Sequence, residues 1–282
     1  MKTEATERGL VYLYCVTGEA PKRKDGVRLS DKPDRQTRAF GQGVYCVSHQ
    51  DLYAVVSNVE ESEFGEENFR KNLADLEWIK TRAATHENVI EDVMKHTHVI
   101  PFKFGTIFNG ESGLKAMLDG HADSLKVNLK RLKGKEEWGL KIYCNMEKLI
   151  DVIPREEAEI TKIEKEINLS SPGKAFFLKK KRDEMVRNAA DKRINQYGQE
   201  SFELLRGLSV ESRINRLLPK EVTEREDTMV LNAAFLVAGD KVAEFVQAAD
   251  DLKAKYRGRG FDFNCTGPWP PYNFCAPAEE KS

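Results

Sequence analysis

A nine-residue segment near the C-terminus, Thr266–Phe274, constrains the fold of this chain more than any other part of its sequence. Three of the chain's ten prolines and three large aromatic residues lie within it. Proline fixes the backbone angle φ and lacks an amide hydrogen, so the segment cannot form a helix or a central strand. Its adjacent prolines favour an extended, polyproline-like backbone. The residues that define the segment are Trp269, Pro270, Pro271, Tyr272 and Phe274.

An extended backbone holds the aromatic side chains of this segment in set directions, which suits packing against another surface. A disordered tail seldom carries so many aromatic residues. We therefore expect the segment to be structural, folding back across the second domain or against the domain junction. Docking onto a separate partner is the alternative.

The size and composition of the chain indicate a globular protein. Its 282 residues are enough for two domains of ordinary size. Hydrophobic residues make up 40% and charged residues 32% of the chain, which indicates a packed core under a highly charged surface. The 45 basic and 46 acidic side chains give a formal net charge of -1. This balance argues against bulk electrostatic binding of nucleic acid.

The sequence shows no feature of an exported or membrane protein. No apolar run approaches the roughly 18–20 residues that span a bilayer. The segment Met1–Gly9 is polar and charged and lacks the apolar core of a signal peptide. The five cysteines are odd in number and include no CxxC pair, which favours reduced, buried thiols. We expect a cytoplasmic protein with no lipid membrane as a partner.

The first half of the chain combines strand and helix patterns. Apolar residues at spacings of three and four predict one long helix over Glu66–Lys95, with His86 filling a gap on its inner face, and another helix over Glu111–Lys133. The polar connection from Gly18 to Gln42 predicts a mobile loop. Alternating apolar residues predict strands at Leu10–Val16, Gly43–Ser48, Leu52–Val59 and Val99–Phe104, the middle two as a hairpin.

The second half shows a related pattern. A highly charged helical region, Met146–Gly207, is interrupted at Ser170–Gly173, which predicts two helices. A further helix is expected over Lys241–Tyr256, with Asp240 as its cap. Strands are predicted at Trp138–Cys144, Leu208–Leu217, Thr228–Ala238 and Phe261–Cys265.

These elements predict a mixed α+β fold of two domains and a tail. Residues 1–134 form the first domain, a modified ferredoxin-like arrangement in which a loop replaces one crossover helix. Residues 135–265 form an α/β domain whose order β-α-β-β-α-β is that of a ferredoxin-like fold with an enlarged helical crossover. Residues 266–282 form a proline- and aromatic-rich tail that packs back on the protein.

The histidines are the residues that invite a catalytic interpretation. His86, His96 and His98, with Glu91, could in principle hold a metal ion. On a helix, however, positions 86 and 91 point about 140° apart, and the sequence contains no HExxH pattern. We expect no catalytic residue, no metal site and no cofactor, and a hydrogen-bonded His86 on the inner face of its helix. A metal-dependent or small-molecule enzyme on a ferredoxin-like scaffold stays open as the alternative.

The densest run of basic charge comprises Lys179, Lys180, Lys181 and Arg182. Acidic residues follow it at once, so a solvated helix face is one interpretation. A contact surface for an acidic partner is the other. Nucleic acid is not expected to bind here, because no alternation of basic and aromatic residues continues beyond the run. Binding of nucleic acid would weaken steeply with salt.

Five segments together resemble the gas vesicle protein F/L family (GvpF and GvpL), and their order and spacing cover residues 9–275. The proline-rich segment near the C-terminus is the most specific of them. Lys103 and Lys174 stand where the family often has arginine, and the loop from Gly18 to Gln42 is individual to this chain. The segments are Tyr12–Tyr14, Val99–Phe108, Glu137–Tyr143, Pro172–Glu184 and Thr266–Phe274.

The resemblance implies a non-enzymatic accessory or minor structural protein of gas vesicle formation, and hence of buoyancy. Its implied partners are the small hydrophobic shell protein (GvpA-type) and other gas vesicle accessory proteins. We expect it to help nucleate or order vesicle assembly, through Phe102, Phe104 and Phe108 or through the basic run. The alternative for these three phenylalanines is a place in the core.

Overall fold

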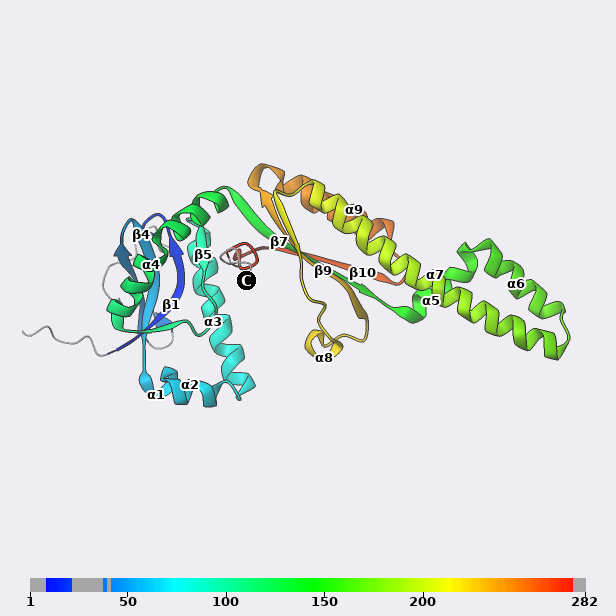
Figure 1. Cartoon of the computed structure of the whole chain (residues 1–282), viewed down its shortest axis with the longest axis horizontal. Helices are drawn as coiled ribbons and strands as arrows, with labels where there is room; N and C mark the ends of the chain where they lie inside the picture. The colour runs from blue at the N-terminus through cyan, green and yellow to red at the C-terminus, as the bar shows by residue number, and fades with distance from the viewer. Residues whose placement is uncertain (1–8, 22–37, 40–41, 276–282) are drawn as a thin grey trace, which may run out of the picture. The chain divides into compact units, whose positions relative to one another are not determined.

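The computed structural model describes residues 9–21, 38–39 and 42–275 (Figure 1). The chain divides into two compact units, one of Met1–Gly134 with Trp269–Ser282 and the other of Lys135–Pro268. We refer to them as the N-terminal and C-terminal units. Most of the predicted loop from Gly18 to Gln42, and the tail beyond residue 275, lie outside the described residues.

The N-terminal unit is built on an antiparallel sheet of order β2-β3-β4-β1-β5, with β6 also paired to β1. The predicted hairpin joins β3 to β4 through Gln50 and Asp51, which both have positive φ. A two-residue turn of this kind matches the twist of the strands it joins. The strands are β1 (Leu10–Thr17), β2 (Arg38–Ala39), β3 (Gln42–His49), β4 (Leu52–Val59), β5 (Val99–Pro101) and β6 (Ile107–Asn109).

The single helix predicted over residues 66–95 is wrong, because the structure has two helices there and a short one just before them. They are α1 (Glu61–Phe64), α2 (Glu66–Asn72) and α3 (Leu76–Met94). The break before α3 has a local cause: the Asp75 side chain accepts hydrogen bonds from the amides of Glu77 and Trp78 and so begins a new helix. Leu73 and Leu76, two apolar residues that fit the helical spacing of this range, are exposed.

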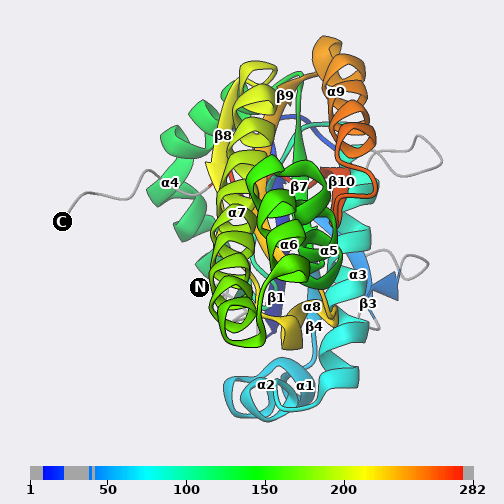
Figure 2. The ribbon, with the colours of Figure 1, turned by 90° about the vertical axis from the view of Figure 1, so that its right-hand side faces the viewer.

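Two long helices pack on the N-terminal sheet. Helix α3 packs on the face that carries Tyr12 and Tyr14, where Ile90 and Val93 are buried. Helix α4 (Gly110–Leu132) contacts β1, β3 and β4 of the same sheet, and Figures 1 and 2 show it on the side opposite α3. Both sheet faces are therefore covered, which accounts for the almost fully buried residues of β1.

The C-terminal unit contains an antiparallel sheet of order β10-β7-β9-β8. Residues of alternate positions on β7 and β9, such as Leu140 opposite Ala233, point to one face and join the main core. Helices α7 and α9 cover that face. The strands are β7 (Lys135–Cys144), β8 (Glu211–Ile214), β9 (Thr228–Ala238) and β10 (Phe261–Trp269).

The charged helical region of this unit forms three helices and not the predicted two. They are α5 (Met146–Glu156), α6 (Ala158–Leu169) and α7 (Pro172–Gly207). The break at Ser170 is confirmed, and Pro172 begins α7, where a proline needs no amide hydrogen bond. A second break falls at Glu157, three residues after Pro154. Short helices α8 (Lys220–Thr223) and η1 (Gly239–Lys241) and helix α9 (Val242–Lys255) complete the unit.

Asp240 does not cap the last helix. It lies inside the 3-10 turn η1, and the residue at the start of α9 makes no side-chain capping bond. The buried face of α9 is nevertheless the one its periodicity predicts, with Phe245, Ala249 and Leu252 in the core.

The proline-rich segment begins as the end of β10, an edge strand of its sheet, and leaves the sheet at Trp269. The peptide bond between Gly267 and Pro268 is cis. After the strand the backbone turns, and the amide of Phe274 donates to the Pro271 carbonyl. The part from Trp269 onward groups with the N-terminal unit.

Candidate functional sites

The polar centre of the N-terminal unit is His86, which is fully buried on α3. Its Nδ1 lies 2.9 Å from the Tyr12 hydroxyl oxygen. Its Nε2 lies 3.1 Å from both the Phe102 carbonyl oxygen and the Tyr272 hydroxyl oxygen. The same Tyr272 hydroxyl donates to Glu87 Oε1 at 2.9 Å. We call His86, Tyr12, Tyr272 and Glu87 the histidine network.

The hydrogen bonds of this network define one arrangement of protons. A carbonyl oxygen can only accept, so the Phe102 carbonyl requires the hydrogen on Nε2 of the imidazole. Nδ1 then accepts from the Tyr12 hydroxyl, which itself accepts from the Gly105 amide at 3.0 Å. The prediction of a hydrogen-bonded histidine on the inner helix face is confirmed.

Burial governs the charges of the network. Removal from water lowers the pKa of His86 to about 4, despite the opposing hydrogen bond to the Phe102 carbonyl, so the imidazole is neutral at pH 7. Burial is also the first cause of the raised pKa values of Tyr12, Tyr272 and Glu87. Since each ring nitrogen already has a partner, the network is suited to holding the C-terminal segment rather than to proton transfer.

An aromatic cluster surrounds the network. The Phe104 ring lies 5.9 Å from the His86 ring, 6.0 Å from Phe69 and 6.1 Å from Trp78, measured between centroids. Gly105 has a φ of 83°, and a Cβ there would lie 2.5 Å from Phe69 Cζ, so only glycine fits between the cluster and the Tyr12 hydroxyl.

The three phenylalanines expected to bind a partner do not share one environment. Phe104 packs into the aromatic cluster, as the core alternative proposed. Phe102 and Phe108 are half-buried, and neither makes an aromatic ring contact with a described residue. Phe102 contributes to the unit through its backbone. Its carbonyl accepts a hydrogen bond from His86, and its amide donates to the Tyr14 carbonyl.

From Trp269 onward the C-terminal segment packs on the N-terminal unit; the sequence led us to expect packing across the second domain or against the domain junction. Pro270 and Pro271 are buried, and Phe274 is fully buried. The Arg131 guanidinium donates to the Phe274 carbonyl. Trp269, in contrast, is 44% exposed. Tyr272 and Phe274 therefore anchor the segment, and the sequence could not show this because their partners lie far away along the chain.

The remaining histidines do not join His86. His98 Nε2 accepts from the Gly134 amide at 2.7 Å, and His96 is exposed. Among the described residues, no group of three or more His, Cys, Asp or Glu side chains is arranged to hold a metal ion. Three cysteines, Cys15, Cys46 and Cys144, are buried as free thiols.

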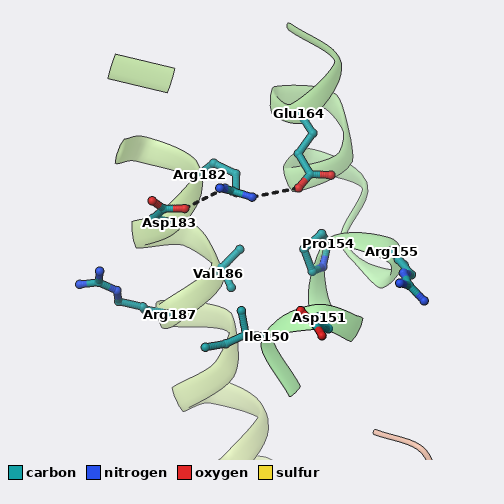
Figure 3. A pocket seen from close by; sticks show the side chains of 9 residues that line it. All are labelled: Ile150, Asp151, Pro154, Arg155, Glu164, Arg182, Asp183, Val186 and Arg187. Carbon is teal, nitrogen blue, oxygen red and sulfur yellow. Dashed lines mark hydrogen bonds and ion pairs between the residues drawn. The ribbon is translucent and has the colours of Figure 1, made fainter. Parts of the chain in front are cut away.

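A shallow groove of about 460 Å³ lies between helices α5, α6 and α7 of the C-terminal unit (Figure 3). Arg182 crosses it: Nη1 lies 3.3 Å from Glu164 Oε1, and Nε lies 2.8 Å from Asp183 Oδ1. The second contact is an ion pair without hydrogen-bond geometry. The groove is lined by Ile150, Asp151, Pro154, Arg155, Glu164, Arg182, Asp183, Val186 and Arg187.

The four residues of the basic run lie in two different environments. Arg182 is half-buried and paired across the groove, whereas Lys179, Lys180 and Lys181 are exposed. No ion pair joins these three lysines to any residue that the structure describes. The run therefore offers three solvated charges on α7 and one structural charge.

Sequence reasoning missed three apolar side chains at the turn between α6 and α7. Leu169 is 88%, Phe176 67% and Phe177 72% exposed. The sequence did contain a pattern that could have indicated these exposed side chains. Two adjacent phenylalanines stand in an otherwise highly charged helix, beside the predicted helix break.

The protein is thus of mixed α+β class with two antiparallel sheets, and its described residues include a saturated polar network and an exposed helical turn. No helix among those residues is long and apolar enough to cross a membrane. The chain belongs to the gas vesicle synthesis protein GvpL/GvpF family, whose pattern matches residues 10–276. This family is not known as a family of enzymes.

Relatives and solved structures agree with this assignment. The chain is 27% identical to gas vesicle protein L of Streptomyces sp. (strain CB03234), over 98% of this chain and 96% of the relative. It is 26% identical to gas vesicle protein F1 of Halobacterium salinarum, over 84% and 83% respectively. Its fold is similar to the crystal structure of GvpF from Anabaena sp. PCC7120, with a TM-score of 0.67, 17% identity, and coverage of 96% of this chain and 99% of that one. GvpF from Microcystis aeruginosa gives a TM-score of 0.62 at 16% identity, covering 95% and 99%.

Proposed function

We propose that this protein is a non-enzymatic accessory or minor structural component of gas vesicle formation. It binds the small hydrophobic shell protein and helps to nucleate or order vesicle assembly in the cytoplasm. The observation that carries the proposal is the family match over residues 10–276, which links nearly the whole chain to gas vesicle synthesis.

The physical rationale lies in the shell protein itself. A subunit that tiles a gas-filled wall must expose apolar surface before assembly, and such a surface aggregates unless another protein covers or orders it. A globular partner with exposed apolar side chains on a charged surface could bind it transiently. The described surface of this chain has that composition, with large apolar side chains exposed on both units.

Two surfaces predicted from sequence stay as proposals for the contact. Phe102 and Phe108 are half-buried and could contribute to a partner surface on the N-terminal unit. The lysines Lys179–Lys181 could contact acidic groups on a partner. Phe104 and Arg182 are less suited to this role, because each is engaged within its own unit.

We also propose the finer classification of the fold as ferredoxin-like. The C-terminal unit supports it, because the four strands follow one another as β7, β8, β9 and β10, with α5–α7 after the first, α9 after the third and only the four-residue α8 after the second. Their sheet order, β10-β7-β9-β8, interleaves two split β-α-β units.

A gene replacement tests the proposed function. In a host that forms gas vesicles, deletion of the gene is expected to abolish or severely reduce vesicles, and the intact gene supplied in trans should restore them. Vesicles would be counted by electron microscopy and by flotation. Normal vesicle number and shape in the deletion strain would disprove the proposal.

A further inference from the structure

The end of the α6–α7 hairpin presents apolar side chains to solvent. Leu169 is the last residue of α6, and Phe176 and Phe177 lie in the first turns of α7. The two phenylalanine rings contact each other edge to face at 5.8 Å between centroids. We call these three residues the hairpin end. Large exposed apolar groups that gather at one place mark interaction sites on soluble proteins.

The hairpin that carries this end has little connection with the core. No residue of α7 before Val186 is buried, and Ile160 is the one buried residue of α6. Figures 1 and 2 show α6 lying beside the N-terminal part of α7, away from the sheet of this unit. The hydrophobic effect within the unit therefore does not explain phenylalanines at this end.

Ion pairs hold the two helices of the hairpin together. Lys174 Nζ lies 2.8 Å from Glu166 Oε1, and Arg182 Nη1 lies 3.3 Å from Glu164 Oε1. Both pairs run between α7 and α6 and leave the phenylalanines exposed. The hairpin end is thus presented on a supported scaffold.

Three exposed lysines on α7 lie close to the two phenylalanine rings. Lys179 and Lys180 follow Phe176 at three and four positions, and Lys180 and Lys181 follow Phe177 in the same way, so they share helix faces with the two rings. All three lysines are exposed, and none lies within 4.0 Å of a described carboxylate, although the charge of Lys181 contributes, after the hydrogen bond from Lys174, to the lowered pKa of Glu166. A partner that covers the rings would therefore bring carboxylates to the lysines.

We propose that the hairpin end, with Lys179–Lys181, docks an apolar face bordered by carboxylates on the unassembled shell protein. This inference rests on the proposed function and assigns its contact to one surface. A second copy of this chain is a poorer occupant, because a symmetric contact would place the lysines of two hairpin ends together. An anionic lipid surface is also poorer, because Asp183 and Glu184 are exposed on the next turn and would meet the same negative surface.

The test uses the full chain, affinity-tagged and co-expressed with the shell protein. The shell protein retained per chain is measured for the wild type and for the double variant F176D/F177D. We expect at least a tenfold loss of retained shell protein in the variant, because aromatic anchors dominate interface energies. The triple variant K179E/K180E/K181E is expected to lower retention as well.

Val127→Asp is the matched control, because Val127 is an apolar residue of α4 with a similar exposure of 65%. It should retain shell protein at the wild-type level. Unchanged melting temperature and helicity in F176D/F177D would show that the variant folds. If the wild type retains shell protein and F176D/F177D retains as much, the hairpin end is not the contact, while the proposed function stands.

Other outcomes overturn the inference in different ways. If the wild type retains no shell protein, the proposed function fails together with the docking surface. Shell-protein retention that does not depend on Phe176 and Phe177 would leave two other occupants. Binding to phosphatidylglycerol vesicles that is lost in F176D/F177D would then assign the hairpin end to a lipid surface. Self-association in sedimentation that is lost in the same variant would assign it to a second copy of this chain.

Discussion

The hydroxyl oxygen of Tyr272 lies 3.1 Å from Nε2 of His86, although 186 positions separate the two residues. The contact joins the segment that follows the last strand to the buried face of α3. A second bond of the same hydroxyl, to Glu87 on the next position of α3, makes the attachment bidentate. The proline-rich segment is therefore an integral part of the N-terminal unit.

Replacing Tyr272 with Phe removes both hydrogen bonds and leaves the ring in place. We expect a loss of about 1–3 kcal/mol of stability, because the hydroxyl binds a carboxylate and leaves it half-buried without that partner. Tyr53→Phe is the control, since the Tyr53 side chain is half-buried and its hydroxyl makes no hydrogen bond to a described residue. Thermal unfolding measures both variants. Equal melting temperatures for the two would show that the network does not stabilise the unit.

The neutral state of His86 predicts a loss of stability in acid. Above pH 6.5 the imidazole is neutral in both the folded and the unfolded chain. As the pH falls, the unfolded chain takes up a proton near 6.5, whereas the folded one does so only near the lowered pKa of about 4. Stability is therefore lost between about pH 6.5 and 4, by on the order of 3 kcal/mol.

Denaturant unfolding at several pH values tests this prediction. His86→Asn should show a shallower decline than the wild type, and His121→Gln, at an exposed position of α4, should decline as the wild type does. The raised pKa of Glu87 works in the opposite sense, because its folded carboxylate takes up a proton earlier as the pH falls. The comparison between variants isolates the histidine. Identical slopes for His86→Asn and the wild type would contradict the buried neutral imidazole.

Local patterns in the sequence predicted much of the fold. The alternation from Trp138 to Cys144 gave a strand, and the periodicity around Phe245 gave the buried face of α9, because these patterns depend on neighbours along the chain. The extra break before α3 was also a local event, with Asp75 as its visible cap. It was overlooked because Leu73 and Leu76 fit the helical spacing while lying at the surface.

The candidate sites could be predicted only in part. His86 was placed on an inner helix face, but its partners Tyr12 and Tyr272 come from distant segments, and no local pattern reports such pairing. The partners of Phe104 were equally hidden from the sequence. Its neighbours along the chain form a short strand-like pattern, which does not indicate the aromatic cluster that Phe104 joins. Adjacent phenylalanines in a charged helix were visible, yet their exposure depends on what packs beside them.

Arg193 is expected to hold the helical region of the C-terminal unit together. Its guanidinium on α7 lies 2.5 Å from Glu156 Oε2 and 3.0 Å from Glu157 Oε1 at the corner between α5 and α6, and its side chain is 11% exposed. Arg193→Met should cost about 2 kcal/mol, because Glu157 loses the guanidinium that it binds and Glu156 keeps only its ion pair with Arg259. Arg206→Met, which removes an exposed pair with Glu203, should change stability by less than about 0.5 kcal/mol. Chemical denaturation measures the free energy of unfolding of both variants. Similar losses would show that the ion pairs of Arg193 stabilise the protein no more than an exposed ion pair does.

Gly267 is expected to tolerate no side chain, because the backbone of β10 passes close to Trp138 on β7. A Cβ at this position would lie 2.8 Å from Cδ2 and 2.9 Å from Cε3 of the Trp138 ring and 3.0 Å from the Glu137 carbonyl oxygen. The φ of 156° is also one that side chains rarely adopt. Gly267→Ala should therefore lower stability by about 1–3 kcal/mol, through displacement of the indole or of the strand.

The matched substitution in the same unit is Gly173→Ala, in the first turn of α7. A Cβ there meets no atom within 4 Å, and alanine is the better helix former by up to about 1 kcal/mol. Gly173→Ala should leave the melting temperature unchanged or raise it, whereas Gly267→Ala should lower it. Tryptophan fluorescence adds a readout at the contact itself, since a displaced Trp138 changes its emission. A Gly267→Ala protein with the melting temperature and emission of the wild type would show that β10 does not approach Trp138 as closely as described.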